Sequence, residues 1–205
     1  DLGREAFGDV LSYPAVWAFW WPRFERIAEW FIDFETQRRE TFRPLLLETK
    51  GTLDIAGPAG GFTLSGTADR IDGDRDGNLS IVDYKTGHPP SFKEVESGMS
   101  PQLALEAAMA ARRGFEDLPG NSVMELLYIR LGGGTPPGEA RSAAKSMTVE
   151  ELAEAAYEGL SRLIAQFDRE ATPYLTRPRP AFVDRFLRLP EQPALCKPAR
   201  IRRVI

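Results

Sequence analysis

The sequence predicts an α/β (α+β) domain in which helices flank a mixed central sheet. Three observations lead to this class. The chain has 205 residues, 42% of them hydrophobic, which is enough for one substantial core. Segments with a helical period are interspersed with segments of alternating, β-branched residues. Their order is helices, three strands, a helix, a strand and a final helix, which is typical of a sheet covered by helices.

The amino-terminal region is helical in pattern and rich in aromatic residues. Residues 13–39 have a helical period, but Pro22 interrupts the segment FWWPRFERIAEWF. Because proline is tolerated in the first turn of a helix and not in its interior, one segment should end near Trp20 and another begin at Pro22. We expect the aromatic residues to pack in the core, with stacking on nucleic-acid bases as the alternative. They are Trp17, Phe19, Trp20, Trp21, Phe24, Trp30, Phe31 and Phe34.

Three strands should follow this region. Residues 45–56 and 61–71 are separated by the turn-forming GPAGG, and together they predict an antiparallel hairpin. Residues 79–85, LSIVDYK, alternate and are rich in β-branched and apolar residues, so they predict the third strand.

A helix and a fourth strand come next. In SPQLALEAAMAARRG, Ser100 is expected to cap a helix that begins at Pro101 and ends by Gly114. Residues 123–131, VMELLYIRL, predict a strand, and residues 132–142 predict a loop.

The last predicted element is a helix over residues 148–167. Thr148 and Glu151 have the spacing of a capping box at its start. Helical spacing predicts that one set of apolar residues faces the core, namely Leu152, Ala156, Leu163 and Phe167.

The stretch DRIDGDRDGNLSIVDYKTG, residues 69–87, fits two kinds of site. Starting at Asp72, it places acidic residues and a glycine at calcium-ligand positions of an EF-hand loop: Asp72, Asp74, Asp76, Gly77 and Asp83. An EF-hand loop needs a helix on each side, whereas here strands are predicted on both sides. The run DGDRDGN instead predicts a β-turn. A calcium-binding module therefore remains a distant alternative.

The other interpretation of the stretch is half of a nuclease active site. Asp83 and Lys85 are two residues apart on one strand, so both side chains leave the same face. Asp69, at the end of the neighbouring strand, can bring its carboxylate to the same side. Two converging carboxylates repel each other unless a cation lies between them, and hard oxygen ligands suit Mg²⁺ or Mn²⁺. Such a cation supports phosphodiester hydrolysis, with Lys85 orienting the water or neutralising a phosphate oxygen.

Several motifs also resemble a known family. GTADRID, IVDYKTG and QLALE, in this order, are similar to the RecB-type branch of the PD-(D/E)XK nuclease superfamily, whose restriction-endonuclease-like core is helix, three strands, helix, strand. FWWPRFERIAEWF, DYKTG and SPQLALEAA resemble more closely the carboxy-terminal nuclease domain of AddB, in its alphaproteobacterial type. The similarity extends from the Trp-rich segment to TPYLTRPRP.

This resemblance implies a function and partners. AddB is a subunit of the AddAB helicase–nuclease, so the implied activity is that of a Mg²⁺- or Mn²⁺-dependent DNA exonuclease. It would degrade a strand of unwound duplex in double-strand-break repair and recombination, in the bacterial cytoplasm. The implied partners are single-stranded DNA, an AddA-like subunit and the rest of the AddB chain. A domain of this fold that binds DNA but no longer cuts it is the alternative.

The resemblance also implies roles for individual residues. Asp69 and Asp83 take the metal-ligand role, with the backbone carbonyl of Tyr84 as an extra ligand. Lys85 takes the role of catalytic lysine. Gln102 matches the family's glutamine at the head of the next helix, which supports the site and contacts the DNA strand.

Glu48 lies in the strand where relatives often carry an acidic residue, and a role for it in the active site stays open. The sequence departs from the family pattern in three other respects. The metal-binding histidine of relatives has no counterpart, because the only histidine is His88, after DYKTG. The tyrosine that often follows the glutamine by four residues is replaced by Glu106. Many relatives carry an iron–sulfur cluster on four cysteines, and the single Cys196 predicts none here.

Charge separates a basic tail, residues 176–205, from the predicted nuclease domain, residues 1–175. The resemblance implies that this domain is truncated at its amino end, because the helix that carries the histidine of relatives is missing. The whole chain has a net charge of −4, but its last thirty residues carry eight basic and two acidic side chains. A basic end can hold phosphates or face a partner protein. No run of eighteen apolar residues and no signal segment occurs, so the sequence gives no support for membrane insertion or secretion.

Overall fold

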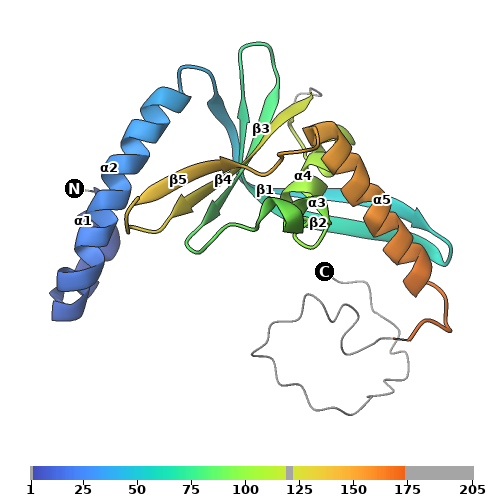
Figure 1. Ribbon diagram of the computed structural model, residues 1–205, viewed down its shortest axis with the longest axis horizontal. Helices are drawn as coiled ribbons and strands as arrows, with labels where there is room; N and C mark the ends of the chain where they lie inside the picture. The colour runs from blue at the N-terminus through green and yellow to red at the C-terminus, as the bar shows by residue number, and fades with distance from the viewer. Residues whose placement is uncertain (1, 119–121, 174–205) are drawn as a thin grey trace.

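The computed structural model describes residues 2–118 and 122–173, and it shows a five-stranded mixed sheet flanked by helices (Figure 1). The predicted fold class is confirmed. The amino-terminal region consists of α1 (Leu2–Phe7), a 3-10 turn η1 (Gly8–Ser12), a π-helical turn η2 (Val16–Trp20) and α2 (Trp21–Arg38). The strands are β1 (Arg43–Gly57), β2 (Gly60–Gly73), β3 (Leu79–Lys85), β4 (Val123–Leu131) and β5 (Gly138–Ser142). The other helices are α3 (Phe92–Glu96), α4 (Gln102–Ala111) and α5 (Val149–Phe167).

The strands lie in the sheet in their chain order. β3 and β4 are parallel, with α3 and α4 in the connection between them, and the other neighbours are antiparallel. Only Arg70 to Gly73 of β2 pair with β3. The rest of the long β1–β2 hairpin therefore leaves the sheet and passes behind α5 in the view of Figure 1. The Asp168 carboxylate, just after α5, accepts a 3.0 Å hydrogen bond from the Ala59 amide at the hairpin's turn.

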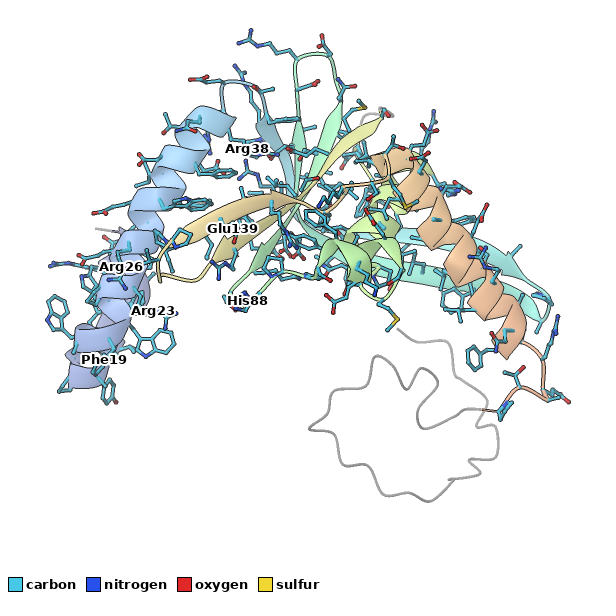
Figure 2. The ribbon with its side chains drawn as sticks, in the orientation of Figure 1. Phe19, Arg23, Arg26, Arg38, His88 and Glu139 are labelled. Carbon is cyan, nitrogen blue, oxygen red and sulfur yellow. The ribbon has the colours of Figure 1, made fainter. Side chains whose placement is uncertain are left out.

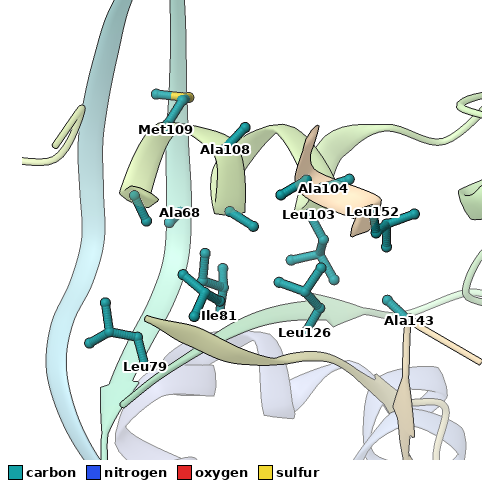
Figure 3. Close-up of a cluster of buried hydrophobic side chains, with 14 of the residues drawn as sticks. Ala68, Leu79, Ile81, Leu103, Ala104, Ala108, Met109, Leu126, Ala143 and Leu152 are labelled. Atoms are coloured by element: carbon teal, nitrogen blue, oxygen red, sulfur yellow. The ribbon is translucent and has the colours of Figure 1, made fainter. Parts of the chain in front are cut away.

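The main core lies between one face of the sheet and the helices α4 and α5 (Figure 3). Ile81 and Leu126 from the strands meet Leu103 of α4 and Leu152 of α5, and all four are buried. The sheet-facing side of α4 is rich in small residues, including Ala104. Because alanine adds little bulk, the helix lies close to the strands, which brings the start of α4 near the end of β3.

A smaller core lies on the opposite face, under α2. Val82 and Ile129 of the sheet pack against Trp30 and Phe34 of α2, so core packing is confirmed for these two aromatic residues. Gly138 of β5 lies under Trp30, and a Cβ there would come within 2.1 Å of the indole ring. The close approach of α2 to β5 therefore requires glycine at this position.

The aromatic residues ahead of Pro22 do not all reach a core. Trp21 is buried, but Trp17, Phe19 and Trp20 expose 50%, 72% and 59% of their surface. For these three residues the prediction of core packing is wrong. Pro22 itself lies in the first turn of α2, as the sequence predicted.

Four local predictions need correction. The predicted loop 132–142 contains the edge strand β5, and a short helix, α3, was not predicted. Ser100 does not cap α4, because the cap position is Pro101 and no side chain caps the helix. On α5 the capping box of Thr148 is confirmed. Leu163 and Phe167 at its far end remain 39% and 37% exposed, so the prediction that they face the core is wrong.

The calcium-loop alternative is excluded by the strands on both sides of the turn. Gly77 adopts a left-handed conformation with φ of 83°, as a tight turn requires. The Asp74 carboxylate accepts hydrogen bonds from the amides of Asp76 and Asn78, at 2.9 and 2.8 Å. Asp72, which would be the first calcium ligand, is fully buried and pairs with two arginines. Asp74 therefore stabilises the backbone of the turn, and Asp72 forms buried ion pairs.

The described part of the chain contains no helix long and apolar enough to span a membrane. The predicted boundary at residue 175, the basic tail 176–205 and Cys196 lie outside the described residues.

Candidate active site

The site forms where β2 and β3 separate. Their antiparallel ladder ends at the pair Arg70 and Val82, so Asp69 and Asp83 are the first residues beyond it. Here the Asp69 carboxylate replaces the backbone partner and accepts a 2.9 Å hydrogen bond from the Tyr84 amide. Asp69 thus lies within β2, between two residues that pair with β1, Ala68 and Arg70, and does not end that strand as predicted. The separation of the strands opens the position between the two carboxylates.

Asp83 and Lys85 leave the same face of β3 and form an ion pair. The Lys85 ammonium lies 2.9 Å from Oδ1 and 2.7 Å from Oδ2 of Asp83. Asp83 is only 2% exposed, while the Lys85 side chain is 30% exposed. The Lys85 ammonium group therefore pairs with the buried acid and is also accessible at the surface.

Gln102, at the start of α4, joins the other groups. Its side-chain NH₂ donates to Oδ1 of Asp83 at 2.7 Å and to Oε1 of Glu106 at 3.2 Å. Its carbonyl oxygen accepts a 3.3 Å hydrogen bond from Lys85. Because all three contacts use one amide, they fix which of its ends faces the acids and which faces the lysine.

Glu106 is the site residue for which the sequence analysis assigned no role. It is 4% exposed, and among the described residues nothing donates a hydrogen bond to its Oε2. Burial raises the pKa of Glu106 to about 7, and the charges of Asp83 and Asp69 add to that rise against the hydrogen bond from Gln102. Its spacing of four residues from Gln102, on one helix face, was the available signal.

Burial also raises the pKa of Asp83. The hydrogen bond and charge of Lys85 oppose this rise, the negative charge of Asp69 adds to it, and the hydrogen bond from Gln102 opposes it. Tyr128 of β4, opposite Asp83 in the parallel register, is buried, and its pKa is raised to about 12 by burial and by the charge of Asp83. The site is thus a low-dielectric position with excess negative charge, where a cation is favoured.

The donor set of the site fits a divalent metal ion in part. Asp69 and Asp83 offer hard oxygen ligands, and the excess negative charge beside the unpartnered Oε2 of Glu106 fits a bound cation. Within residues 2–118 and 122–173, however, no three His, Cys, Asp or Glu side chains are arranged to hold a metal ion. A metal here would therefore rest on two carboxylates, supplemented by backbone carbonyl and water.

The side chains of three other residues named from the sequence make no hydrogen bond to Asp69, Asp83, Lys85 or Gln102 within the described part of the chain. Glu48 is exposed on β1 with φ of 46°, between the pairs that flank Asp69. His88 is exposed in the loop after β3. The Tyr84 ring packs on the α2 side, where its hydroxyl accepts a 3.1 Å hydrogen bond from Arg70.

A second polar cluster, on the α2 face, supports the site from behind. Asp72 accepts hydrogen bonds from Arg38 at 2.8 Å and from Arg70 at 2.5 Å. Arg70 also donates to Glu35 of α2 at 2.5 Å. Burial by itself raises the pKa of Glu35, but the hydrogen bonds and charges of Arg70 and Arg39 outweigh it and lower this pKa overall. The buried ion pairs attach α2 to β2, the strand that carries Asp69.

Fold and site together define a class of protein. A mixed sheet, with an Asp on one strand, an Asp-x-Lys on the next and a Gln on the following helix, is an arrangement suited to metal-assisted hydrolysis. The family model described as "PD-(D/E)XK nuclease superfamily" matches residues 4–180, and the chain belongs to this superfamily.

Similar proteins include uncharacterized proteins of Rickettsia. One from Rickettsia conorii is 38% identical over 96 residues, which is 47% of this chain and 12% of the relative. One from Rickettsia felis is 33% identical over 119 residues, 57% of this chain and 14% of the relative. The matches thus span about an eighth of the length of these relatives. Among solved structures, that of SSO0001 is similar with a TM-score of 0.34 and 12% identity, over 56% of this chain and 49% of the other.

Proposed function

We propose that this chain is a divalent-metal-dependent deoxyribonuclease domain that hydrolyses phosphodiester bonds of single-stranded DNA. The observation that carries the proposal is the convergence of Asp69, Asp83, Lys85 and Gln102 where β2 and β3 separate. Membership of the PD-(D/E)XK nuclease superfamily supports it independently.

The proposed chemistry divides the work among these side chains. Asp69 and Asp83 would hold Mg²⁺ or Mn²⁺ with the Tyr84 carbonyl. When bound, the metal lowers the pKa of an attacking water and stabilises the charge on the reacting phosphate. Lys85 is half-exposed and presents its ammonium group to a phosphate oxygen. Gln102 holds Asp83 and Lys85 in their relative positions through its two ends.

We further propose that the domain belongs to an AddB-type subunit of a helicase–nuclease. The support is the similarity of FWWPRFERIAEWF, DYKTG and SPQLALEAA to that family and the much greater length of the relatives. In such a complex the domain would act as an exonuclease on one strand of unwound duplex during double-strand-break repair. Its partners would be an AddA-like subunit and the rest of the longer chain, in the bacterial cytoplasm.

One observation favours a second candidate, a domain that binds DNA without cutting it. Both oxygens of Asp83 are paired with Lys85, and among the described residues only two carboxylates, without a third ligand side chain, would hold the metal. Mg²⁺ dehydrates reluctantly, and a site with only two protein carboxylates would therefore bind it weakly.

The experiment that separates the two is a cleavage assay on end-labelled single-stranded DNA with Mg²⁺, Mn²⁺ or EDTA. The proposal expects metal-dependent cutting that Asp83→Ala abolishes and that the control Asp76→Ala, in the exposed turn, leaves unchanged. DNA binding without cutting in either metal would support the second candidate. Cutting that Asp83→Ala does not affect would refute the site.

A further inference from the structure

A second polar hollow lies beside the candidate active site. It has a volume of about 320 Å³ and is formed by α2, the loop after β3 and the loop between β4 and β5. Its side-chain lining includes Arg23, Thr86, His88, Arg130 and Thr135. None of the described residues that line it is acidic. Figure 2 shows Arg23 on α2 and His88 in the loop after β3 on the same side of the molecule.

The cations of this hollow are held in place by the fold. Arg23 donates a 2.5 Å hydrogen bond to the Gly132 carbonyl, and Arg26 donates to the Gly133 carbonyl at 3.1 and 2.7 Å. Gly133 has φ of 65° and packs against the backbone of Arg23, so the β4–β5 loop is fitted closely to α2. Arg23 uses part of its guanidinium group for the loop, and its positive charge remains in the lining of the hollow.

Arg130 supplies a second fixed charge at the end of β4. Its side chain is 19% exposed, and its buried Nε makes no hydrogen bond, although that atom lies 3.4 Å from Oε2 of Glu139. This N–O distance is too long for a good hydrogen bond. Glu139 lies outside the lining, so the balance of charge facing the hollow is positive.

An exposed aromatic surface continues from Arg23, at the start of α2, onto the π-helical turn η2 that precedes this helix. The Arg23 guanidinium lies 5.5 Å from the centre of the Trp20 ring, which is 59% exposed. Phe19, labelled near the far end of the helix in Figure 2, is 72% exposed. A positively charged groove beside exposed aromatic rings is the combination that binds single-stranded nucleic acid, because phosphates meet the cations and bases stack on the rings.

The hollow is also close to the reacting groups. Thr86, Gly87 and His88 directly follow Lys85, and three residues of extended chain span at most about 11 Å. A single strand with one phosphate at Lys85 therefore needs only a short further path to place another phosphate in the hollow.

We propose that this hollow is a second phosphate-binding subsite for the same DNA strand, in which Arg23, Arg130 and His88 bind a backbone phosphate and Trp20 stacks on a neighbouring base. The inference deepens the proposed function and depends on it for the identity of the strand. It assigns the exposed Trp20 to DNA and gives the single histidine a role outside the metal site.

The test is the binding of a fluorescein-labelled oligothymidylate to the whole chain in EDTA, measured by fluorescence anisotropy over a range of salt concentrations. Arg23→Gln should weaken binding several-fold and reduce the slope of log affinity against log salt by about 0.7, the value for one phosphate of a single strand. Trp20→Ala should weaken it about 5-fold or more, and Trp20→Phe should restore most of the loss. The matched control is Arg162→Gln, an exposed arginine of α5 in a surface ion pair.

Two comparisons complete the test. Inorganic phosphate and thymidine monophosphate are added as competitors, because a site for a free phosphate compound would be blocked by either at low concentration. The affinity of Arg130→Gln for the oligonucleotide is compared with that of Arg130→Lys, after circular dichroism has shown that both variants melt as the parent chain does. If Arg23→Gln and Trp20→Ala bind the oligonucleotide as tightly as Arg162→Gln, the subsite is refuted. Efficient competition by a free phosphate compound also refutes it.

Failure of the nuclease proposal would look different. Because the binding assay contains EDTA and no metal, it measures binding at the subsite separately from any metal-dependent cutting. Binding that depends on Arg23 and Trp20, in a chain that never cuts, would leave the subsite standing and remove the nuclease activity.

Discussion

The side-chain amide of Gln102 donates a 2.7 Å hydrogen bond to Oδ1 of Asp83, so the first residue of α4 is joined to the buried acid of β3. Lys85 approaches the same oxygen at 2.9 Å from the other side. Asp83 is thus held by a neutral and a charged donor, and each can be removed separately.

Removal of the charged donor should affect cleavage more than folding. Lys85→Ala is expected to lower the cleavage rate about 10²- to 10³-fold, because a positive charge that faces the transition state is lost. The same change leaves Asp83 buried without its cation, so in EDTA the free energy of unfolding should fall by about 1–3 kcal/mol.

Mn²⁺ distinguishes the two effects of this substitution. If the metal binds Asp83, thermal melts of Lys85→Ala with Mn²⁺ should recover the lost stability while cleavage stays low. Lys93→Ala, an exposed lysine on α3, is the control for loss of a positive charge. Melting temperature and activity that fall and recover together would show that Lys85 is a structural partner only.

The metal ligands are tested by direct binding. In a calorimetric titration with Mn²⁺, Asp69→Asn and Asp83→Asn should each remove most of the heat of binding, because each takes away one of two carboxylate ligands. Asp76→Asn, whose residue lies exposed in the β2–β3 turn, should bind Mn²⁺ as the parent chain does. Binding that requires Asp76 and tolerates Asp83→Asn would contradict the site.

The strands that carry this site could be predicted from the sequence, because their signals are local. LSIVDYK alternates in the way a strand does, and GPAGG marks the turn of the hairpin, so β1, β2 and β3 were expected close to their observed bounds. β5 was missed because GEARS has one apolar side chain and is a strand only by pairing with β4. Its strand conformation depends on hydrogen bonds to β4 and leaves no alternating apolar pattern in the sequence.

The functional side chains were predictable only in part. Asp69, Asp83, Lys85 and Gln102 were expected as a set, and the structure brings them together. The role of Asp72 could not be predicted from its neighbours. Its two arginine partners come from α2 and β2, and Arg38 is 34 residues away. A local pattern therefore suggested a calcium ligand where the fold makes a buried ion pair.

That ion pair should contribute strongly to stability. Asp72→Ala leaves the guanidinium groups of Arg38 and Arg70, which are 7% and 4% exposed, without their shared carboxylate. Loss of one partner of a buried ion pair destabilises by about 3–5 kcal/mol. Urea denaturation should show this loss, whereas Asp76→Ala should stay within about 0.5 kcal/mol of the parent chain. Equal stability of the two variants would mean that Asp72 is not needed to hold α2 on the sheet.

Glu106 should make the metal-free chain less stable as the pH rises. Its pKa is 4.5 as an ordinary glutamate and about 7 in the folded chain. Between these values the unfolded chain has lost the proton that the folded chain still binds, so the free energy of unfolding falls as pH increases through this window. Below pH 4.5 there is no penalty from this group, and above pH 7 the full penalty of about 3 kcal/mol is present.

Glu106→Gln removes this ionisable group and keeps an oxygen that can accept the hydrogen bond from Gln102. In EDTA the variant should therefore gain stability relative to the parent chain as the pH is raised from 5 to 8, by up to about 3 kcal/mol. The measurement is urea denaturation of both chains at a series of pH values. The control is Glu154→Gln, an exposed glutamate of α5 that pairs with Arg112 at the surface. A constant difference between Glu106→Gln and the parent chain across that pH range would show that Glu106 titrates normally and is not held in a low-dielectric site beside Asp83.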